Sequence, residues 1–511
     1  MTPILRDFAA RFTDARNEPA LRHGELIVSG RDFWDDVHRR AAVLRERGVS
    51  RADRVALFMR KHPEAVSWLF AALLCGAIAV PIDRRSPAPR ISALLASLDP
   101  VLALFDESSF TRFEKSGGRL PDAGKIIHAD AIDEAAAPSL KPFVGAEITA
   151  DDPALILMTS GTTGDPKGIT LSHGNLAAFS DWAIETFALG PDDRFLNIAP
   201  LHFDLSLLDV LTALRIGAQV TLADEADAMF PARLGGLLEG HGISVLYTVP
   251  TILQGMVAKG GLAGRQLPDL RWILFAGEIY PAPALAQLID AVGGTRLANL
   301  FGPTETNVIT WKVVERAPDI DESPNIGVAC SHARIALCDA QGAPVAPGES
   351  GEICVAGPTV MQGYWDRPEL TRARYFDGRP GLFRTGDFGF VDAAGDIRFT
   401  GRQDRQVKLR GNRVELEAIE ARALALPGVA AAAATVSDNG QSLCLHIAAE
   451  PGVELSKSGM LRKLVTVSAH HELPEHFIFY AEWPTINSGK SDLGSLRDNH
   501  GKLLAEMSDS S

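Results

Sequence analysis

A loop of glycine and hydroxyl residues directly follows a short apolar run at residues 154–158. The stretch reads LMTSGTTGDPKGIT from Leu157 to Thr170. Its glycines let backbone N–H groups converge, while its hydroxyls and the Lys167 ammonium add donors and positive charge, which is typical of an anion cradle. A Walker A loop has lysine directly after its second glycine, whereas Lys167 stands further on, after Gly164. The loop therefore predicts a phosphate site of another kind, and a surface linker is the alternative interpretation.

Four later stretches also combine ionisable side chains with glycine turns. Taken alone, Asp387 in one of them is more simply a solvated turn residue, and Lys490 in another is more simply a surface charge. The stretches are NLFGPTET at 299–306, LFRTGDFG at 382–389, GRQDRQVKLRGNRVE at 401–415 and INSGKSDL at 486–493.

Short aliphatic runs alternate with helical periodicity over roughly the first 330 residues, and these elements must position the loop. Apolar strands separated by helices predict a parallel or mixed α/β sheet covered on both faces. From about 330 to 400, turns of Gly, Pro and Asp divide the strands, which predicts a β-rich subdomain. Roughly the last hundred residues predict a compact second domain that is small enough to move as a body. The runs are RVALFM, AIAVPI, ALILMTS, AQVTLAD, SVLYTVP and RWILFAG.

The composition excludes several classes of protein. The 511-residue chain is 46% hydrophobic and 22% charged, which is ordinary for a globular protein and disfavours disorder or a fibre. With 50 Lys and Arg against 64 Asp and Glu, the net charge of -14 argues against nucleic acid as a partner. The five cysteines are widely spaced and contain no C-x-x-C pair, so we expect reduced thiols with neither a disulfide framework nor a zinc site.

Neither export nor membrane insertion is indicated. The N-terminal residues alternate charged with apolar side chains, which argues against a signal peptide and predicts an amphipathic helix. The most apolar stretch, from Trp68 to Asp83, falls short of the about 20 residues that span a bilayer and is broken at Gly76 and Pro81. We expect a cytoplasmic protein without a membrane partner, in which this stretch forms a buried helix leading into a buried strand.

The loop sequence TSGTTGDPKG resembles the signature loop of the adenylate-forming superfamily, which includes acyl-CoA synthetases, firefly luciferase and the adenylation domains of non-ribosomal peptide synthetases. The four later stretches follow in the order of that family, so the resemblance covers essentially the whole chain. It implies an α/β fold with a large N-terminal adenylation domain at 1–402, a β-rich subdomain at about 330–402, a hinge at 403–405 and a small mobile α+β C-terminal domain at 406–511. It also implies that a carboxylate is joined to the α-phosphate of ATP and that pyrophosphate is released.

The resemblance implies a role for each motif. The loop would hold the β- and γ-phosphates, Phe301 would lie against adenine, Thr304 would bond the α-phosphate, and Glu305 would ligate Mg²⁺ as a hard oxygen donor. Many relatives carry tyrosine at Phe301, a change that retains stacking. Asp387 would accept the ribose hydroxyls with help from Arg402. The residues implied to bind ATP or AMP are Thr159, Ser160, Gly161, Thr162, Thr163, Gly164, Phe301, Gly302, Asp387 and Arg402, and those implied to act in catalysis are Lys167, Thr304 and Lys490.

The C-terminal domain is implied to serve two half-reactions by rotating. Lys490 would reach the α-phosphate and the substrate carboxylate during adenylation, and Asp404 would be the hinge residue. After rotation, Gly411 would line the tunnel for an incoming phosphopantetheine thiol because it lacks a side chain, with Arg413 beside it.

Asp204, in the sequence FDLS, points to an amino acid as the substrate. Amino-acid-activating relatives place an aspartate here to pair with the substrate ammonium, whereas capping of the following helix is the alternative interpretation. The implied pocket wall is otherwise aliphatic apart from one tyrosine, so a polar or charged side chain would lack a partner and a modest apolar amino acid is favoured. The implied amino-acid-binding residues are Asp204, Leu205, Leu208, Tyr247, Leu274, Ala276, Leu300 and Val308.

Read in order, this set resembles that of stand-alone L-proline-activating enzymes that load a carrier protein on the way to pyrrole-2-carboxyl units. Valine, leucine and alanine stay open, because one methylene in an apolar pocket is worth only about 1 to 3 kcal/mol. Few residues follow Lys490, so we expect the acceptor to be a separate phosphopantetheinylated carrier protein, with coenzyme A as the competing acceptor. An acyl-CoA synthetase, a non-catalytic adenylate-binding protein and a P-loop NTPase are the alternative classes.

Overall fold

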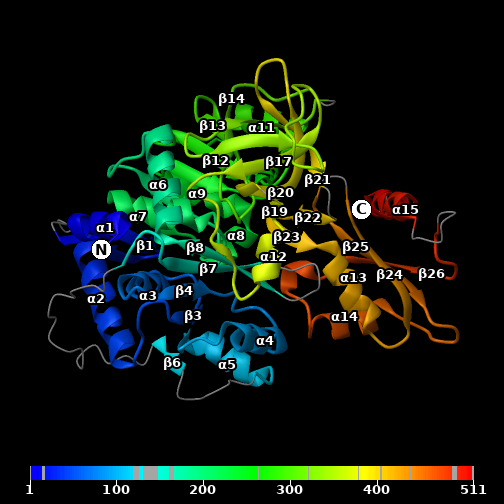
Figure 1. Ribbon diagram of the computed structural model, residues 1–511, viewed down its shortest axis with the longest axis horizontal. Helices are drawn as coiled ribbons and strands as arrows, with labels where there is room; N and C mark the ends of the chain where they lie inside the picture. The colour runs from blue at the N-terminus through cyan, green and yellow to red at the C-terminus, as the bar shows by residue number, and fades with distance from the viewer. Residues whose placement is uncertain are drawn as a thin grey trace.

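The computed structural model describes residues 2–13, 18–118, 126–129, 148–159, 166–262, 264–319, 322–377, 379–402, 405–437, 440–485 and 492–508. Two large sheets with helices packed around them make up the chain to residue 402, and a smaller group of strands and helices follows at its side (Figure 1). This arrangement confirms the predicted α/β class.

A seven-stranded mixed sheet carries the phosphate loop. Its strands β3, β4, β5, β6 and β7 pair in parallel, while β7–β8 and β8–β18 are antiparallel, so the loop joins two adjacent antiparallel strands. In order across the sheet, the strands are β18 (Gly363–Tyr364), β8 (Lys167–Ser172), β7 (Pro153–Thr159), β4 (Ile78–Pro81), β3 (Arg54–Phe58), β5 (Leu102–Phe105) and β6 (Ile126–His128).

The apolar stretch from Trp68 to Asp83 forms the end of helix α3 (Pro63–Leu74) and strand β4, as predicted. Proline occupies the first turn of α3, where its missing N–H has no helical partner to lose. Almost every residue of the helix is buried, and all four residues of β4 are buried. A helix that is apolar on all sides is stable here because it is enclosed by other elements.

A fourteen-stranded sheet provides most of the remaining framework. Strands β9 to β13 are parallel neighbours, and antiparallel β14 and β15 join them to the β-rich segment, so that segment continues the same sheet. The strands in order are β16 (Arg334–Cys338), β17 (Gly351–Ala356), β20 (Arg379–Val391), β21 (Ile397–Arg402), β15 (Asn325–Ala329), β14 (Thr310–Val314), β13 (Arg296–Phe301), β12 (Trp272–Ala276), β11 (Val245–Thr248), β9 (Arg194–Asn197), β10 (Gln219–Leu222), β1 (Pro19–His23) and β2 (Leu26–Ser29), with β19 (Tyr375–Phe376) pairing β20.

Helices cover these sheets (Figure 1). They are α1 (Pro3–Thr13), α2 (Gly30–Glu46), α4 (Ala88–Leu98), α5 (Glu107–Lys115), α6 (His173–Phe187), α7 (Ala213–Ile216), α8 (Glu225–Met229), α9 (Pro231–Gly240), α10 (Pro250–Ala258), α11 (Ala282–Val292) and α12 (Pro368–Arg372).

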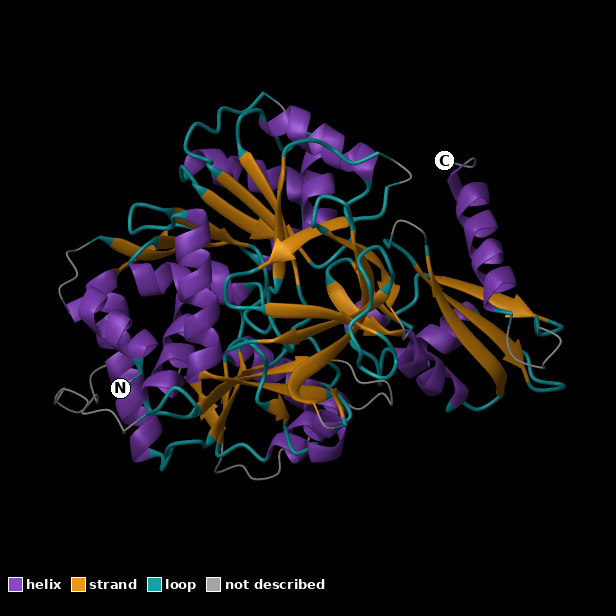
Figure 2. Cartoon of the chain, turned by 45° about the horizontal axis from the view of Figure 1, so that its top comes forward, coloured by secondary structure: helices purple, strands orange, loops and turns teal. Residues whose placement is uncertain are grey.

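The C-terminal part, from residue 405, contains a hairpin, a three-stranded sheet and three α-helices within the described residues. Helix α15 packs on β24 of that sheet (Figure 2), and the run of five alanines from Ala430 to Ala434 lies in β24. The elements are β22 (Gln406–Leu409), β23 (Asn412–Glu415), α13 (Leu416–Leu424), β24 (Val429–Val436), β25 (Leu443–Ala449), α14 (Lys457–Leu464), β26 (His476–Tyr480) and α15 (Leu493–Ser508), with a 3₁₀ turn at His470–Glu472.

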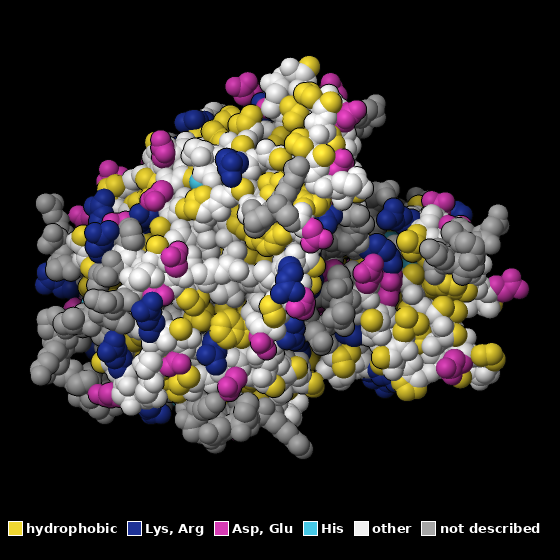
Figure 3. Space-filling view, in the orientation of Figure 1, with side chains coloured by type: hydrophobic (Ala, Val, Ile, Leu, Met, Phe, Trp, Pro, Cys, Tyr) yellow, Lys and Arg dark blue, Asp and Glu magenta, His cyan; other side chains and the backbone are white. Residues whose placement is uncertain are grey.

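The surface and the thiols agree with the composition. Acidic and basic side chains are interspersed on the face seen in Figure 3. All five cysteines are free and buried. Among the described residues, no helix is long and apolar enough to cross a membrane.

Candidate active site

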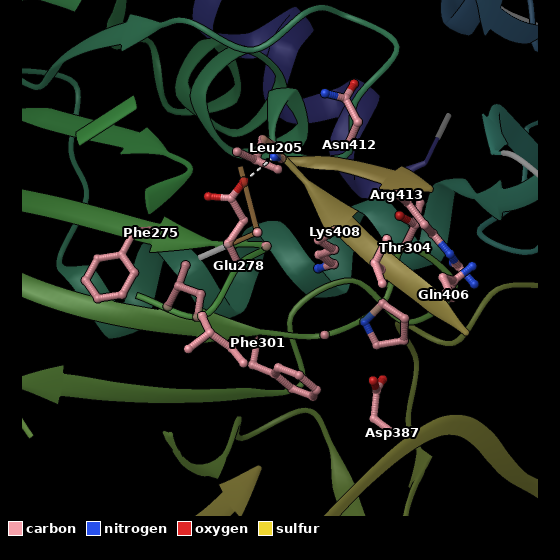
Figure 4. A pocket seen from close by; sticks show the side chains of 18 of the residues that line it. Leu205, Phe275, Glu278, Phe301, Thr304, Asp387, Gln406, Lys408, Asn412 and Arg413 are labelled. Atoms are coloured by element: carbon pink, nitrogen blue, oxygen red, sulfur yellow. Dashed lines mark hydrogen bonds between the residues drawn. The ribbon is translucent and has the colours of Figure 1, made fainter. Parts of the chain in front are cut away.

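A cavity of about 1210 Å³ lies between the N-terminal sheets and the hairpin β22–β23. Its walls include the end of β13, the FGPTE loop, strand β20 at Asp387, and the hairpin itself (Figure 4). Pockets for small ligands commonly occupy 300 to 1,000 Å³, so this cavity has room for a nucleotide with further groups beside it.

The FGPTE loop brings three of the predicted nucleotide residues to the cavity. Phe301 ends β13 and its ring lies 5.7 Å from that of Phe399 between centroids, while Gly302 and Thr304 line the cavity next to it. A Cβ on Gly302 would stand 1.8 Å from the carbonyl oxygen of Asn307, so this tight turn accepts only glycine. The backbone therefore fixes the loop that presents Phe301 and Thr304.

Glu305 is buried beneath this loop, with its side chain 2% exposed. The Tyr364 hydroxyl donates to Oε1 at 2.7 Å, and Arg413 Nη1 of the hairpin donates to Oε2 at 2.5 Å. Burial opposes ionisation, but the Arg413 guanidinium, the charge of Arg374 and the hydrogen bond from Tyr364 together lower the pKa of Glu305 to about 2. A buried, ionised carboxylate is a suitable hard ligand for Mg²⁺, and in this arrangement Arg413 supplies the opposing charge.

Asp387 and Arg402 are neighbours, as the predicted ribose site requires. They pair across β20 and β21, and Arg402 Nη1 lies 2.5 Å from Asp387 Oδ1. Burial raises the pKa of Asp387, although the nearby charges of Arg402 and Lys408 oppose that shift. Both residues line the cavity, and Asp387 lies on the side of Phe301 (Figure 4).

Lys167 begins β8 at the end of the phosphate loop, and it is directed towards the hairpin. Its Nζ lies 3.6 Å from Glu415 Oε1 and 5.9 Å from the centre of the Tyr364 ring. Burial lowers the pKa of Lys167, against the attraction of Glu415. Thr159 and Pro166 line the cavity at the two ends of the loop, while the predicted loop residues Ser160, Gly161, Thr162, Thr163 and Gly164 lie outside the described residues.

The turn of the hairpin presses against the N-terminal part. The Gly411 N–H donates to the Glu278 carboxylate, whose other oxygen accepts from the Thr251 hydroxyl at 2.7 Å. Gly411 has φ of 78°, and a Cβ there would approach Val249 Cγ1 to 2.8 Å. Gly411 and Arg413, predicted to line the thiol tunnel, thus both lie in the cavity wall, and glycine is required for the close approach.

Lys408 is a site residue that the sequence did not single out. It lies on β22, and its side chain lies in the cavity between Glu278 and Asp387 in Figure 4. A Cβ on Gly277 would lie 3.9 Å from its Nζ. Burial lowers the pKa of Lys408, while the charges of Asp204 and Asp387 raise it. Because β-strand side chains alternate, Gln406 and Lys408 lie on the same face of β22 and both line the cavity, a spacing that the sequence QVK at 406–408 already contained.

Three carboxylate or hydroxyl groups were missed as well, namely those of Glu278, Tyr364 and Glu415. They lie at or after strand ends or within the hairpin motif, and a lone glutamate or tyrosine there does not by itself indicate a functional residue. Their signal is purely spatial, because their partners Gly411, Glu305 and Lys167 are distant in the chain.

Asp204 lines the cavity at the start of the segment that leads into a π-helix (Leu207–Thr212). The N-cap of that helix is Ser206, so capping by Asp204, the alternative interpretation, is not the arrangement found. Burial raises the pKa of Tyr247, and the charge of Asp204 adds to the shift, so the two side chains are neighbours.

The hydrophobic residues of the predicted amino-acid pocket are all buried in one cluster. Parallel pairing places Tyr247 opposite Leu274 and Ala276 opposite Leu300, which explains how separate strands bring them together. Leu205 and Leu300 line the cavity beside Asp204, and the others do not. The cluster members are Leu205, Leu208, Tyr247, Leu274, Ala276, Leu300 and Val308.

Lys490 and Asp404, predicted as the adenylation lysine and the hinge residue, lie outside the described residues. No group of three or more His, Cys, Asp or Glu side chains that could hold a metal ion occurs within the described ranges.

The family model "AMP-binding enzyme" matches residues 8–365, and the chain belongs to that family. A protein of Pseudomonas fluorescens named L-proline--[L-prolyl-carrier protein] ligase is 37% identical over 90% of this chain and 89% of its own length. A protein of Streptomyces coelicolor with the same name is 36% identical over 84% of this chain and 83% of its own length. The structure of the amide bond synthetase McbA from Marinactinospora thermotolerans superposes with a TM-score of 0.87 over 96% of this chain and 99% of that one, at 22% identity, which establishes the shared fold.

Proposed function

We propose that this protein is an L-proline–carrier-protein ligase. It forms L-prolyl-AMP from proline and ATP with release of pyrophosphate, and then transfers the prolyl group to the phosphopantetheine thiol of a separate carrier protein. The observation that carries the proposal is Asp204 at a cavity whose neighbouring wall is buried and hydrophobic, in a chain that matches two relatives of that name over most of its length.

In the first half-reaction, a carboxylate oxygen of proline attacks the α-phosphorus, and the bond to the pyrophosphate oxygen breaks. Phe301 holds adenine, and Asp387 with Arg402 holds the ribose. Thr304 and Lys490 orient the α-phosphate and the carboxylate, which places the two reactants in line. The loop from Thr159 to Lys167 binds the β- and γ-phosphates. Mg²⁺, held by Glu305, would neutralise phosphate charge when bound.

In the second half-reaction, the thiol sulfur attacks the prolyl carbonyl carbon, the thiol proton leaves to solvent, and the carbonyl–phosphate oxygen bond breaks to release AMP. The contacts of Gly411 with Glu278 and of Arg413 with Glu305 support this as the step for which the present orientation is arranged. The Lys408 ammonium, placed near both Asp204 and Asp387, stabilises the negative charge that develops on the adenylate during attack.

Proline fits the pocket by charge and by polarity. Its secondary ammonium carries two N–H donors for the Asp204 carboxylate, and its ring is compact and apolar. The buried leucines Leu205 and Leu300 offer that ring a dry surface, whereas a hydroxyl or charge would be left without a partner, at about 2 kcal/mol or more. Val308 and Ala276 extend the same hydrophobic cluster.

Further parts of the proposal rest on the resemblance and on the relatives. The prolyl thioester would be the precursor of a pyrrole-2-carboxyl unit in a secondary metabolite such as an antibiotic, and the reaction would take place in the cytoplasm. Residues 1–402 would act as the adenylation domain, 403–405 as the hinge, and 406–511 as the body that rotates between the two half-reactions.

Amino-acid-dependent exchange of labelled pyrophosphate into ATP tests the proposal. Proline is expected to give the highest rate, with alanine and valine lower by about tenfold or more, as expected for a pocket that fits one side chain. Equal exchange with valine or alanine would remove the proline assignment. Coenzyme A consumption with an organic acid, without amino-acid-dependent exchange, would identify an acyl-CoA synthetase instead.

A further inference from the structure

A buried carboxylate joins the two parts of the molecule outside the hairpin. Glu472 lies in the 3₁₀ turn His470–Glu472 of the C-terminal part, and its side chain is 0% exposed. Its Oε2 accepts from Arg90 Nη1 at 2.9 Å and from Arg422 Nη1 at 2.6 Å. Arg422 belongs to the C-terminal helix α13, whereas Arg90 belongs to α4 of the N-terminal part.

Hydrogen bonds within the C-terminal part also fix the position of the Glu472 carboxylate. The same Oε2 accepts the N–H of Ala469 at 2.9 Å, so the carboxylate also closes its own turn. Burial opposes its ionisation, but the guanidinium groups of Arg90 and Arg422 lower the pKa of Glu472 to about 2. The carboxylate is therefore ionised at neutral pH, and half of its neutralising charge comes from across the interface.

The turn also approaches the segment that leads to Asp204. His471 lines the main cavity, as do His202 and Asp83 of the N-terminal part. Burial lowers the pKa of His471 to about 4, and the charges of Arg90, Asp83 and His202 act on it. His202 directly precedes Phe203 and Asp204, so the docked turn lies beside the backbone that carries the proposed ammonium ligand.

The described residues join the two parts at several places. Gly411 and Arg413 of the hairpin form one contact, Gln441 Nε2 donates to the Thr251 hydroxyl at 2.7 Å, and Arg90 bonds Glu472. A rigid body attached at one point can still pivot, whereas a second point fixes its direction. Of these contacts, the bond between Arg90 and Glu472 is the one that pairs buried charges outside the hairpin.

We propose that Arg90 and Glu472 are positioning residues for thioester formation: their ion pair latches the C-terminal part in the orientation that seats Gly411 in the cavity. The inference rests on the proposed function, because only that function makes this orientation the one for thioester formation. It assigns neither residue to contact with substrate. Rotation for adenylation separates Arg90 from Glu472, while Arg422 stays with Glu472 within the C-terminal part and keeps its charge paired.

The test compares Arg90→Gln with wild type in both half-reactions and in hydrogen exchange. Proline-dependent pyrophosphate exchange is expected to stay unchanged, whereas prolyl transfer to D-pantetheine, the thiol end of the carrier's prosthetic group, is expected to fall about tenfold, the effect of one charge-assisted bond. Backbone amides of α4 and of the turn 470–472 are expected to exchange faster in the full-length variant. Arg265→Gln is the matched control, because Arg265 pairs with Glu239 at 2.7 Å within the N-terminal part, and all three readouts should match wild type.

Double-mutant analysis separates the latch from a folding defect. Because Glu472→Gln also weakens the contact with Arg422, Arg90→Gln is the primary variant, and adding Glu472→Gln to it should lower transfer by less than Glu472→Gln does alone. Unchanged amide protection and unchanged transfer in Arg90→Gln would overturn the latch, as would equal losses in both half-reactions. Failure of the wild type to exchange pyrophosphate with any amino acid would instead contradict the proposed function, and the amide protection of α4 would still decide the latch.

Discussion

Gly411→Ala tests how closely the hairpin must approach the N-terminal part. Gly411 has φ of 78°, a left-handed conformation that costs a residue with a Cβ about 1 to 2 kcal/mol. That cost belongs to the hairpin turn itself and is present in both domain orientations. The new Cβ would also lie 2.8 Å from Val249 Cγ1, and this clash exists only when the hairpin is seated. Overpacking of this kind typically costs about 1 to 3 kcal/mol, which corresponds to a decrease of about 5- to 150-fold.

The assay again separates the two half-reactions. Pyrophosphate exchange with proline should be nearly unchanged in Gly411→Ala, whereas prolyl transfer to pantetheine should fall within the range above. Gly452→Ala is the matched control, because Gly452 has φ of 82° and nothing within 4 Å of a new Cβ. Val249→Ala in the same chain should restore transfer by removing the opposing methyl groups. Transfer by Gly411→Ala equal to that of Gly452→Ala would refute the close approach.

Three further outcomes follow from the charges at the site. Asp204→Asn should lower kcat/KM for proline about 100-fold in the exchange assay while the KM for ATP stays constant, because the ammonium loses its charged partner; an unchanged proline KM would contradict the assignment. Lys408→Met should lower prolyl transfer about 100-fold and leave exchange unchanged, since it removes one charge from the second transition state; an equal loss in both assays would show another role. The pKa of Glu305 and that of Glu472 both fall from 4.5 to about 2, so the stabilisation from their ion pairs is complete above about 4.5 and is lost as the pH falls towards 2. The unfolding temperature should therefore be constant near neutral pH and decline as the pH falls below about 4.5. This decline should be less steep in Glu305→Gln than in wild type, and an equally steep decline in both proteins would contradict the buried ion pair.

The sequence predicted the strands well because they are buried. All six aliphatic runs form strands within one or two residues of their predicted bounds, since parallel strands covered on both faces read as continuous apolar segments. The continuity of the β-rich segment with the large sheet was not predictable in this way. It depends on the antiparallel pairing of β14 with β15 and of β15 with β21, which joins distant residues and leaves no pattern in the sequence.

Site residues that belong to a sequence motif could be predicted, whereas those that depend on a partner far away in the chain could not. The FGPTE loop, Asp387 with Arg402, and Gly411 with Arg413 all reach the cavity, because each belongs to a short glycine-containing motif of the chain. No sequence pattern singled out Lys408, Glu278 or Glu472. Their contacts form only when the C-terminal part packs against segments that are distant in the chain. The deeper pocket residues, such as Leu274, are indistinguishable from core by type alone.

Pyrophosphate exchange with proline, valine and alanine supplied one at a time is the most direct test that the protein activates proline through Asp204. The exchange rate with proline is expected to exceed that with the other two amino acids by about tenfold or more. Exchange with proline is also expected to be lost in Asp204→Asn. Exchange that is equal for the three amino acids, or that survives in Asp204→Asn, would contradict activation of proline through Asp204.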